Sequence, residues 1–198
     1  MMIKTFAGGA ALAFALLPAP AAVANAYRAK GKPAIVANSR MKVTPPRDWN
    51  RLSMRPGKKA ETWTLDGEQL NDVTWYAGIA AGEPLIRERS KKREPLPKFT
   101  RETLLVEVPE LLEATYRTEK SIGTFSVTGS MPDRFLARDG IRFTYDYVDN
   151  DNLPRKGEAR ATIVSNVLYM VSFDAPRLHY FDKTLPDFRT LSDSALLE

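Results

Sequence analysis

The chain has 198 residues, of which 43% are hydrophobic and 27% are charged, and its net charge is +5. This length suffices for one domain with a sizeable core, while so mild a basic excess says little about an acidic partner. The chain has no cysteine. Disulfides, thiol catalysis and thiolate metal sites are therefore excluded.

The N-terminal segment has the layout of a secretory signal peptide. One charged side chain, Lys4, precedes an uncharged apolar run over residues 6–17. That run is too short for a helix to cross the ~30 Å hydrocarbon core of a bilayer, which takes about 20 residues. It is followed by Ala24-Asn25-Ala26, the small-x-small pattern that signal peptidase accepts. We expect cleavage after Ala26, which removes residues 1–26 and leaves a periplasmic protein in a bacterium, or a secreted one.

An uncleaved N-terminal anchor is the alternative for this segment. The short apolar run and the Ala-x-Ala site argue against it. No cysteine follows the run, so a bacterial lipoprotein anchor is excluded. After cleavage we expect a protein that does not span the membrane, with 28 Lys and Arg against 24 Asp and Glu and a net charge of +4.

Residues 27–40 mix Ala, Gly and Pro with four basic residues and show no hydrophobic period. We expect them to form a flexible leader, followed by a single domain over residues 41–198. From residue 41 onward, apolar and polar residues alternate in several segments, which is typical of half-buried strands. Strands are expected over residues 51–54, 61–65, 73–79, 125–127, 141–147, 159–163 and 167–173.

Three features of this pattern are specific. Asp66-Gly67 is a turn signal between the second and third strands and predicts a hairpin. Residues 82–99 are polar and rich in proline, which indicates a long surface loop. Residues 167–173 are apolar at nearly every position, which predicts a central strand covered on both faces.

Two helices complete the expected order of elements. Pro109 suits a first helical turn and apolar residues follow it at helical spacing, which predicts a helix over residues 108–119. Thr184 and Asp187 have the spacing of a capping box and predict the start of a closing helix. Pro176 and Pro186 argue against one long helix. The fold class is therefore α+β, with one antiparallel sheet and helices packed on it.

Residue types that carry catalysis are sparse. His179 is the only histidine, so no second His exists for a zinc pair, and a packing or surface role is preferred. Ser39 and Lys42 have Ser-x-x-Lys spacing, but no Lys-Thr-Gly or Ser-Asp-Asn follows, which indicates a chance match. Four acidic residues surround one expected hairpin: Asp146, Asp149, Asp151 and Glu158. They could hold a cation or share a proton, but we interpret them first as solvated turn residues.

The strongest charge feature is a basic run inside the expected loop. Five cations in seven residues could contact an anionic lipid headgroup, an anionic polysaccharide or a nucleic acid, and export makes nucleic acid the least natural of these. A solvated loop, partly neutralised by Glu88 and Glu94, is the plainer alternative. The candidate ligand-binding or partner-binding residues are Arg87, Arg89, Lys91, Lys92 and Arg93.

Four segments together resemble a PsbP-type domain. They are residues 46–50 (PRDWN), 61–67 (ETWTLDG), 109–112 (PELL) and 169–176 (YMVSFDAP), the last followed by Tyr180 and Phe181. The resemblance spans about residues 41–191. It implies an α/β/α sandwich with a central antiparallel sheet flanked by helices. It implies no active site, since members serve as binding or assembly modules, bacterial envelope proteins among them, so we expect no catalytic residues, metal or cofactor.

Three hypotheses for function follow. The main one is an exported, non-enzymatic binding or assembly module of the cell envelope that has an envelope protein as its partner. The alternative is a carrier or sensor of a small apolar or anionic ligand, which requires a cavity between sheet and helix. The third is a hydrolase, which requires Asp146 to meet another carboxylate or His179 in one cleft.

Overall fold

The computed structural model describes residues 25–90, 92–93 and 95–198. Residues 1–24 of the expected signal peptide lie outside the described residues. The helical elements are η1 (Leu105–Glu107), α1 (Val108–Glu119) and α2 (Tyr180–Asp193). The strands are β1 (Ala26–Arg28), β2 (Ala34–Ile35), β3 (Met41–Val43), β4 (Trp49–Arg51), β5 (Ala60–Thr64), β6 (Asp72–Ala80), β7 (Phe125–Phe135), β8 (Arg138–Val148), β9 (Pro154–Val164), β10 (Val167–Pro176) and β11 (Leu196–Leu197).

Eight strands form one antiparallel sheet in the order β1-β4-β5-β6-β10-β9-β8-β7, and a small sheet has the order β11-β3-β2. β10 lies in the middle of the large sheet and is buried over nearly its whole length, which confirms the expected central strand. The expected hairpin of β5 and β6 is also present.

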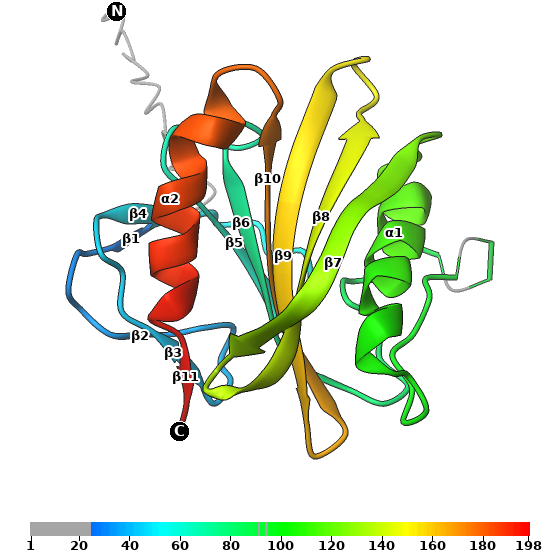
Figure 1. Cartoon of the computed structure of the whole chain (residues 1–198), viewed down its shortest axis with the longest axis horizontal. Helices are drawn as coiled ribbons and strands as arrows, with labels where there is room; N and C mark the ends of the chain where they lie inside the picture. The colour runs from blue at the N-terminus through cyan, green and yellow to red at the C-terminus, as the bar shows by residue number, and fades with distance from the viewer. Residues whose placement is uncertain (1–24, 91, 94) are drawn as a thin grey trace, which may run out of the picture.

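Alternation along β10 sends its side chains to two separate cores. Val171 and Phe173 pack in the core that includes Phe188 of α2, whereas Leu168 and Met170 pack in the core that includes Leu112 of α1. Because successive strand residues point to opposite faces, one strand serves both cores. The two helices accordingly lie on opposite sides of the sheet, α2 in red and α1 in green in Figure 1.

The helix over 108–119 occurs as expected, with Pro109 in its first turn. The closing helix differs: α2 begins at Tyr180, so Thr184 lies inside it and is not its N-cap. Phe181, whose ring stacks on Phe173 at 5.3 Å, holds this extra first turn in the core. Pro186 is tolerated within the helix because the carbonyl that loses its donor belongs to exposed Asp182.

The prediction that residues 27–40 form a flexible leader is wrong. Its first residues belong to β1, which pairs with β4, and Ala34 and Ile35 form β2 beside β3. Val36 and Ala37 are buried in the core beneath α2. The segment lacks a hydrophobic period because its two strands are only two and three residues long, which is too short for a period to be seen.

Candidate binding site

The basic loop is anchored to the sheet at several points. The N–H of Arg87 donates to the carbonyl of Pro56 at 2.8 Å, and the N–H of Gly82 donates to the carbonyl of Phe99 at 2.7 Å. Leu85, Leu96 and Phe99 are buried. The two ends of the loop, residues 82–87 and 96–99, are therefore held on the domain, and the exposed cations at positions 89, 92 and 93 lie between them.

Four of the five candidate cations lie in the described part, and all four are exposed: Arg87, Arg89, Lys92 and Arg93. Lys91 lies outside the described residues. The structure does not bring the four together on one site. Arg89 forms an ion pair with Glu119 of α1 at 2.7 Å. Arg87 instead lines a pocket together with two lysines from the turn before β5.

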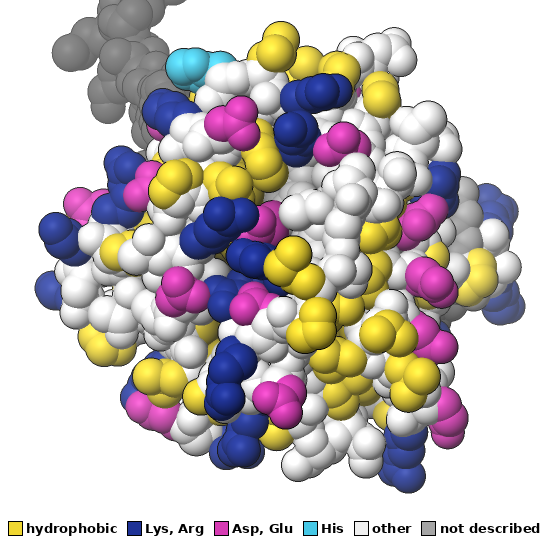
Figure 2. Space-filling view, viewed as in Figure 1, with side chains coloured by type: hydrophobic (Ala, Val, Ile, Leu, Met, Phe, Trp, Pro, Cys, Tyr) yellow, Lys and Arg dark blue, Asp and Glu magenta, His cyan; other side chains and the backbone are white. Residues whose placement is uncertain are grey.

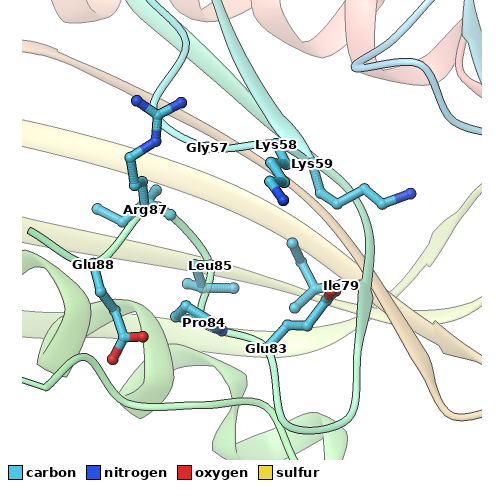
Figure 3. Close-up of a pocket in the computed structure, with 10 residues that line it drawn as sticks. Gly57, Lys58, Lys59, Ile79, Glu83, Pro84, Leu85, Arg87 and Glu88 are labelled. Carbon is cyan, nitrogen blue, oxygen red and sulfur yellow. The ribbon is translucent and has the colours of Figure 1, made fainter. Parts of the chain in front are cut away.

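The pocket that Arg87 lines has a volume of about 300 Å³ and lies between the turn at residues 57–59 and the loop at residues 83–88 (Figure 3). The turn packs closely on the loop because Gly57 has no side chain: a Cβ there would lie 3.2 Å from the Cα of Ile86. In the close-up, Lys58 reaches toward the middle of the lining residues, whereas the charged ends of Lys59, Arg87 and Glu88 extend outward. We call this pocket, with Lys58, Lys59 and Arg87 on its walls, the basic pocket.

A buried polar cluster lies elsewhere, at one end of the large sheet, beside a pocket of about 590 Å³. Its centre is Asp174 of β10, which accepts hydrogen bonds from the hydroxyls of Tyr147 at 2.6 Å and Tyr116 at 2.8 Å. Nη2 of Arg155 lies 3.3 Å from the same carboxylate and Nζ of Lys120 lies 3.8 Å away. The cluster thus ties β8, β9, β10 and α1 together.

Two carboxylates of this cluster have opposite pKa directions. Burial alone would raise the pKa of Asp174, but Lys120, Arg155 and the two tyrosine hydroxyls hold it below its usual range. Burial and the nearby charge of Asp174 raise the pKa of Asp72 to about 7. Burial also raises the pKa of Tyr147 and Tyr116 well above the usual range, so both remain hydrogen-bond donors.

The sequence contained one signal for this cluster, which was missed. Asp174 is the only charged residue among the apolar positions of β10, and a lone charge in a strand covered on both faces needs partners. Its partners come from residues 116 to 155 and have no common motif, so they could not be named from the sequence.

The acids expected around the β8–β9 hairpin do not converge. Asp149 accepts the N–H groups of Asp151 and Leu153 within the turn, at 3.0 and 2.9 Å. Glu158, by contrast, is buried and accepts two hydrogen bonds from Arg189 of α2, at 2.9 and 2.6 Å. His179 is exposed at the start of α2. Within the described residues, no group of three or more His, Asp or Glu could hold a metal ion.

The aromatic residues of the strands serve the core. Trp63 and Trp75 pack together at 5.7 Å beneath α2, and Tyr145 stacks on Phe125 at 5.0 Å on the other face. These aromatic residues therefore belong to the two cores. In the part of the chain that the structure describes, no helix is long and apolar enough to span a membrane.

The comparisons with known proteins bear on the fold. No protein-family model matches the sequence, and no curated protein matches it. The solution structure of cyanobacterial PsbP (CyanoP) from Synechocystis sp. PCC 6803 superposes with a TM-score of 0.55 at 10% identity, over 92% of this chain and 99% of that one. The fold is PsbP-like.

A second solved structure has the same arrangement over part of its length. A crystal structure from Bacteroides thetaiotaomicron VPI-5482 matches with a TM-score of 0.50 at 10% identity, over 85% of this chain and 49% of that one. The sandwich implied by the PsbP resemblance is present in part: α1 packs on one face of the sheet, while α2 shares the other face with the small sheet of β2, β3 and β11.

Proposed function

We propose that the chain is an exported, non-enzymatic binding module of the cell envelope that docks a protein partner through its basic loop. One observation carries this proposal. The ends of the loop are hydrogen-bonded to the domain at Gly82 and Arg87, and its cations are exposed. Among the described residues, Arg87, Lys92 and Arg93 have no carboxylate within ion-pair distance. Exposed cations without an ion-pair partner favour recognition of an acidic partner surface.

Two buried carboxylates, Asp174 and Glu158, support a role other than catalysis. Asp174 is engaged by two tyrosines, Arg155 and Lys120, and Glu158 is engaged by Arg189. A general base or nucleophile needs a free electron pair within reach of a substrate. These carboxylates instead use their electron pairs to join strands and helices.

Export is part of the proposal and has its own test. Ala26 is the first residue of β1, where it pairs with Arg51, and Asn25 accepts the N–H of Ser53 at 2.9 Å. Cleavage after Ala26 would leave Tyr27 and Arg28 paired with β4. We expect N-terminal sequencing of the protein from the cell envelope fraction to begin at Tyr27. A protein that retains residue 1 in the cytoplasmic fraction would contradict export.

The partner is tested by chemical cross-linking of the tagged full-length chain in the cells that produce it, followed by mass spectrometry. The loop variant changes Arg89, Lys91 and Lys92 to Gln. Its matched control changes three exposed cations outside the loop, Lys32, Arg101 and Arg138, to Gln.

We expect one envelope protein to be cross-linked by the wild type and by the control, and lost in the loop variant. Equal cross-linking by both variants would show that the loop is only solvated surface. Reproducible recovery of a lipid without a protein would also contradict the proposal.

A further inference from the structure

The cations of the basic pocket come from two separate segments. Lys58 and Lys59 belong to the turn before β5, and Arg87 belongs to the loop after β6. The bond from the Arg87 N–H to the Pro56 carbonyl holds the two segments together. Among the described residues none of these three side chains forms an ion pair, whereas Arg89, two positions on, is paired. The pocket therefore brings together three cations, none of which is held in an ion pair, and they outnumber the two carboxylates of its lining.

Two carboxylates line the same pocket, and each accepts a hydrogen bond from the backbone. Glu83 accepts the N–H of Ala80 at 3.0 Å, and Glu88 accepts the N–H of Leu96 at 3.2 Å. Both bonds close local turns of the loop. In Figure 3 the Glu88 side chain extends away from Lys58. The lysines and Arg87 thus remain available to an anion from outside.

Below the cations the pocket is apolar. Ile79 and Leu85 close its bottom and are about 1% exposed, while Pro84 and Ile86 keep part of their surface open. A closed apolar bottom beneath a cationic rim fits a ligand that has an apolar part with a negative charge beside it. It does not fit a purely polar anion, which would leave the apolar surface wet.

We propose that the basic pocket binds a segment of the partner protein in which an acidic residue adjoins an apolar one. The carboxylate would meet Lys58 and Arg87, and the apolar side chain would cover Pro84 and Ile86. This inference rests on the proposed function and names the chemistry of its partner.

The size of the pocket favours a peptide over a lipid. About 300 Å³ is at the lower end of ligand sites, and the buried side chains of Ile79 and Leu85 stop any extension inward. An acyl chain would need a longer channel, whereas one side chain of a peptide fits. Charge complementarity is the second argument for a peptide, since the three cations form no ion pair and outnumber the two carboxylates of the lining.

The test measures binding of short fluorescent peptides to the mature chain by anisotropy. One peptide alternates Glu and Leu, a second alternates Glu and Ser, and a third alternates Lys and Leu. Vesicles of phosphatidylglycerol are tested separately by co-sedimentation. The pocket variant is Lys58→Glu with Arg87→Glu, and the matched control is Lys32→Glu with Arg138→Glu, which has the same change of net charge at exposed positions.

We expect the Glu and Leu peptide to bind most tightly. The pocket variant should weaken it by at least about tenfold and the control by less than about twofold, as for rim charges that act locally. Equal binding of the Glu and Ser peptide, equal loss in the control, or binding of vesicles alone would overturn the inference. If the cross-linked envelope partner depends on Arg89 and Lys92 but is unaffected by the pocket variant, this inference fails and the proposed function stands.

Discussion

Asp72 of β6 and Asp174 of β10 lie directly opposite each other in the sheet. The repulsion between their two carboxylates is offset by different means at each residue. Asp174 keeps its charge because two tyrosines, Arg155 and Lys120 surround it. Among the described residues, the only hydrogen-bond donor to Asp72 is the N–H of Gln69, at 3.0 Å. Asp72 is thus the member of the pair that takes up a proton near neutral pH.

Asp72→Asn should therefore stabilise the protein in alkaline solution. The pKa of Asp72 is raised to about 7 in the folded state. The stability that the protonated Asp72 contributes is therefore fully present below the unfolded pKa near 4 and is lost as the pH rises through 7. We expect the variant to exceed the wild type by up to about 4 kcal/mol in free energy of unfolding at pH 8, since a difference of one pKa unit corresponds to about 1.4 kcal/mol, and to match it near pH 4. Urea unfolding at both pH values measures this, and equal stability at pH 8 would contradict it.

Asp174→Asn should be strongly destabilising. It removes the negative charge that faces buried Arg155, and breaking one side of a buried ion pair costs about 3–5 kcal/mol. Because the pKa of Asp174 is lowered, its contribution is present above the unfolded pKa and is lost as the pH falls. The gap between variant and wild type should accordingly narrow in acid. A loss below about 1 kcal/mol at pH 7 would show that the cluster is not a structural tie.

Tyr116→Phe separates the hydrogen bond from the charge. The substitution deletes one donor to Asp174 and keeps the aromatic packing against Phe125 and Tyr145. We expect a loss of about 1.5–3 kcal/mol, the range for a bond to a charged group, measured by urea unfolding. An unchanged stability would mean that Tyr147 and Arg155 suffice for Asp174.

Gly157→Ala should disrupt the sheet around Tyr145. These residues are paired across β8 and β9, and a Cβ on Gly157 would lie 2.0 Å from the Tyr145 ring. The buried ring cannot move without displacing Phe125 and Phe143, so we expect a loss of about 1–3 kcal/mol. Gly123→Ala is the control, since no heavy atom lies within 4 Å of its added Cβ. Similar melting temperatures for the two variants would refute the packing argument.

Substitutions at two adjacent residues test whether the segment over residues 27–40 is part of the domain. Val36 is fully buried beneath α2, whereas Ile35 is 56% exposed. Val36→Asp should prevent folding or lower the melting temperature sharply because it buries an unpaired charge, and Ile35→Asp should have a small effect. A flexible leader would tolerate both changes equally. Circular dichroism melts distinguish these outcomes.

The sequence predicted the elements whose pattern is long and local. The helix over 108–119 followed from apolar spacing and Pro109, and the central strand followed from an apolar run. β7 was expected only at Phe125 and Val127, because most of its residues face solvent and show no alternation. β1 and β2 were too short to show any period. Short or solvent-exposed strands are formed by pairing with neighbours, which local patterns do not record.

The candidate residues divide in the same way. The basic run was visible in the sequence because its cations are consecutive, yet only the structure shows that Arg87 joins Lys58 at a pocket while Arg89 pairs with Glu119. The cationic rim of that pocket joins residues almost 30 positions apart.

By itself, then, the sequence determined the fold class and the order of most elements, since these depend on composition and on periods within one segment. It also suggested the export signal, which stays a hypothesis. Tertiary structure alone decided that residues 27–40 belong to the domain, and that Asp72 and Asp174 meet. Strand register and the packing of two cores on one sheet set these contacts, and neither is written in any single stretch of the chain.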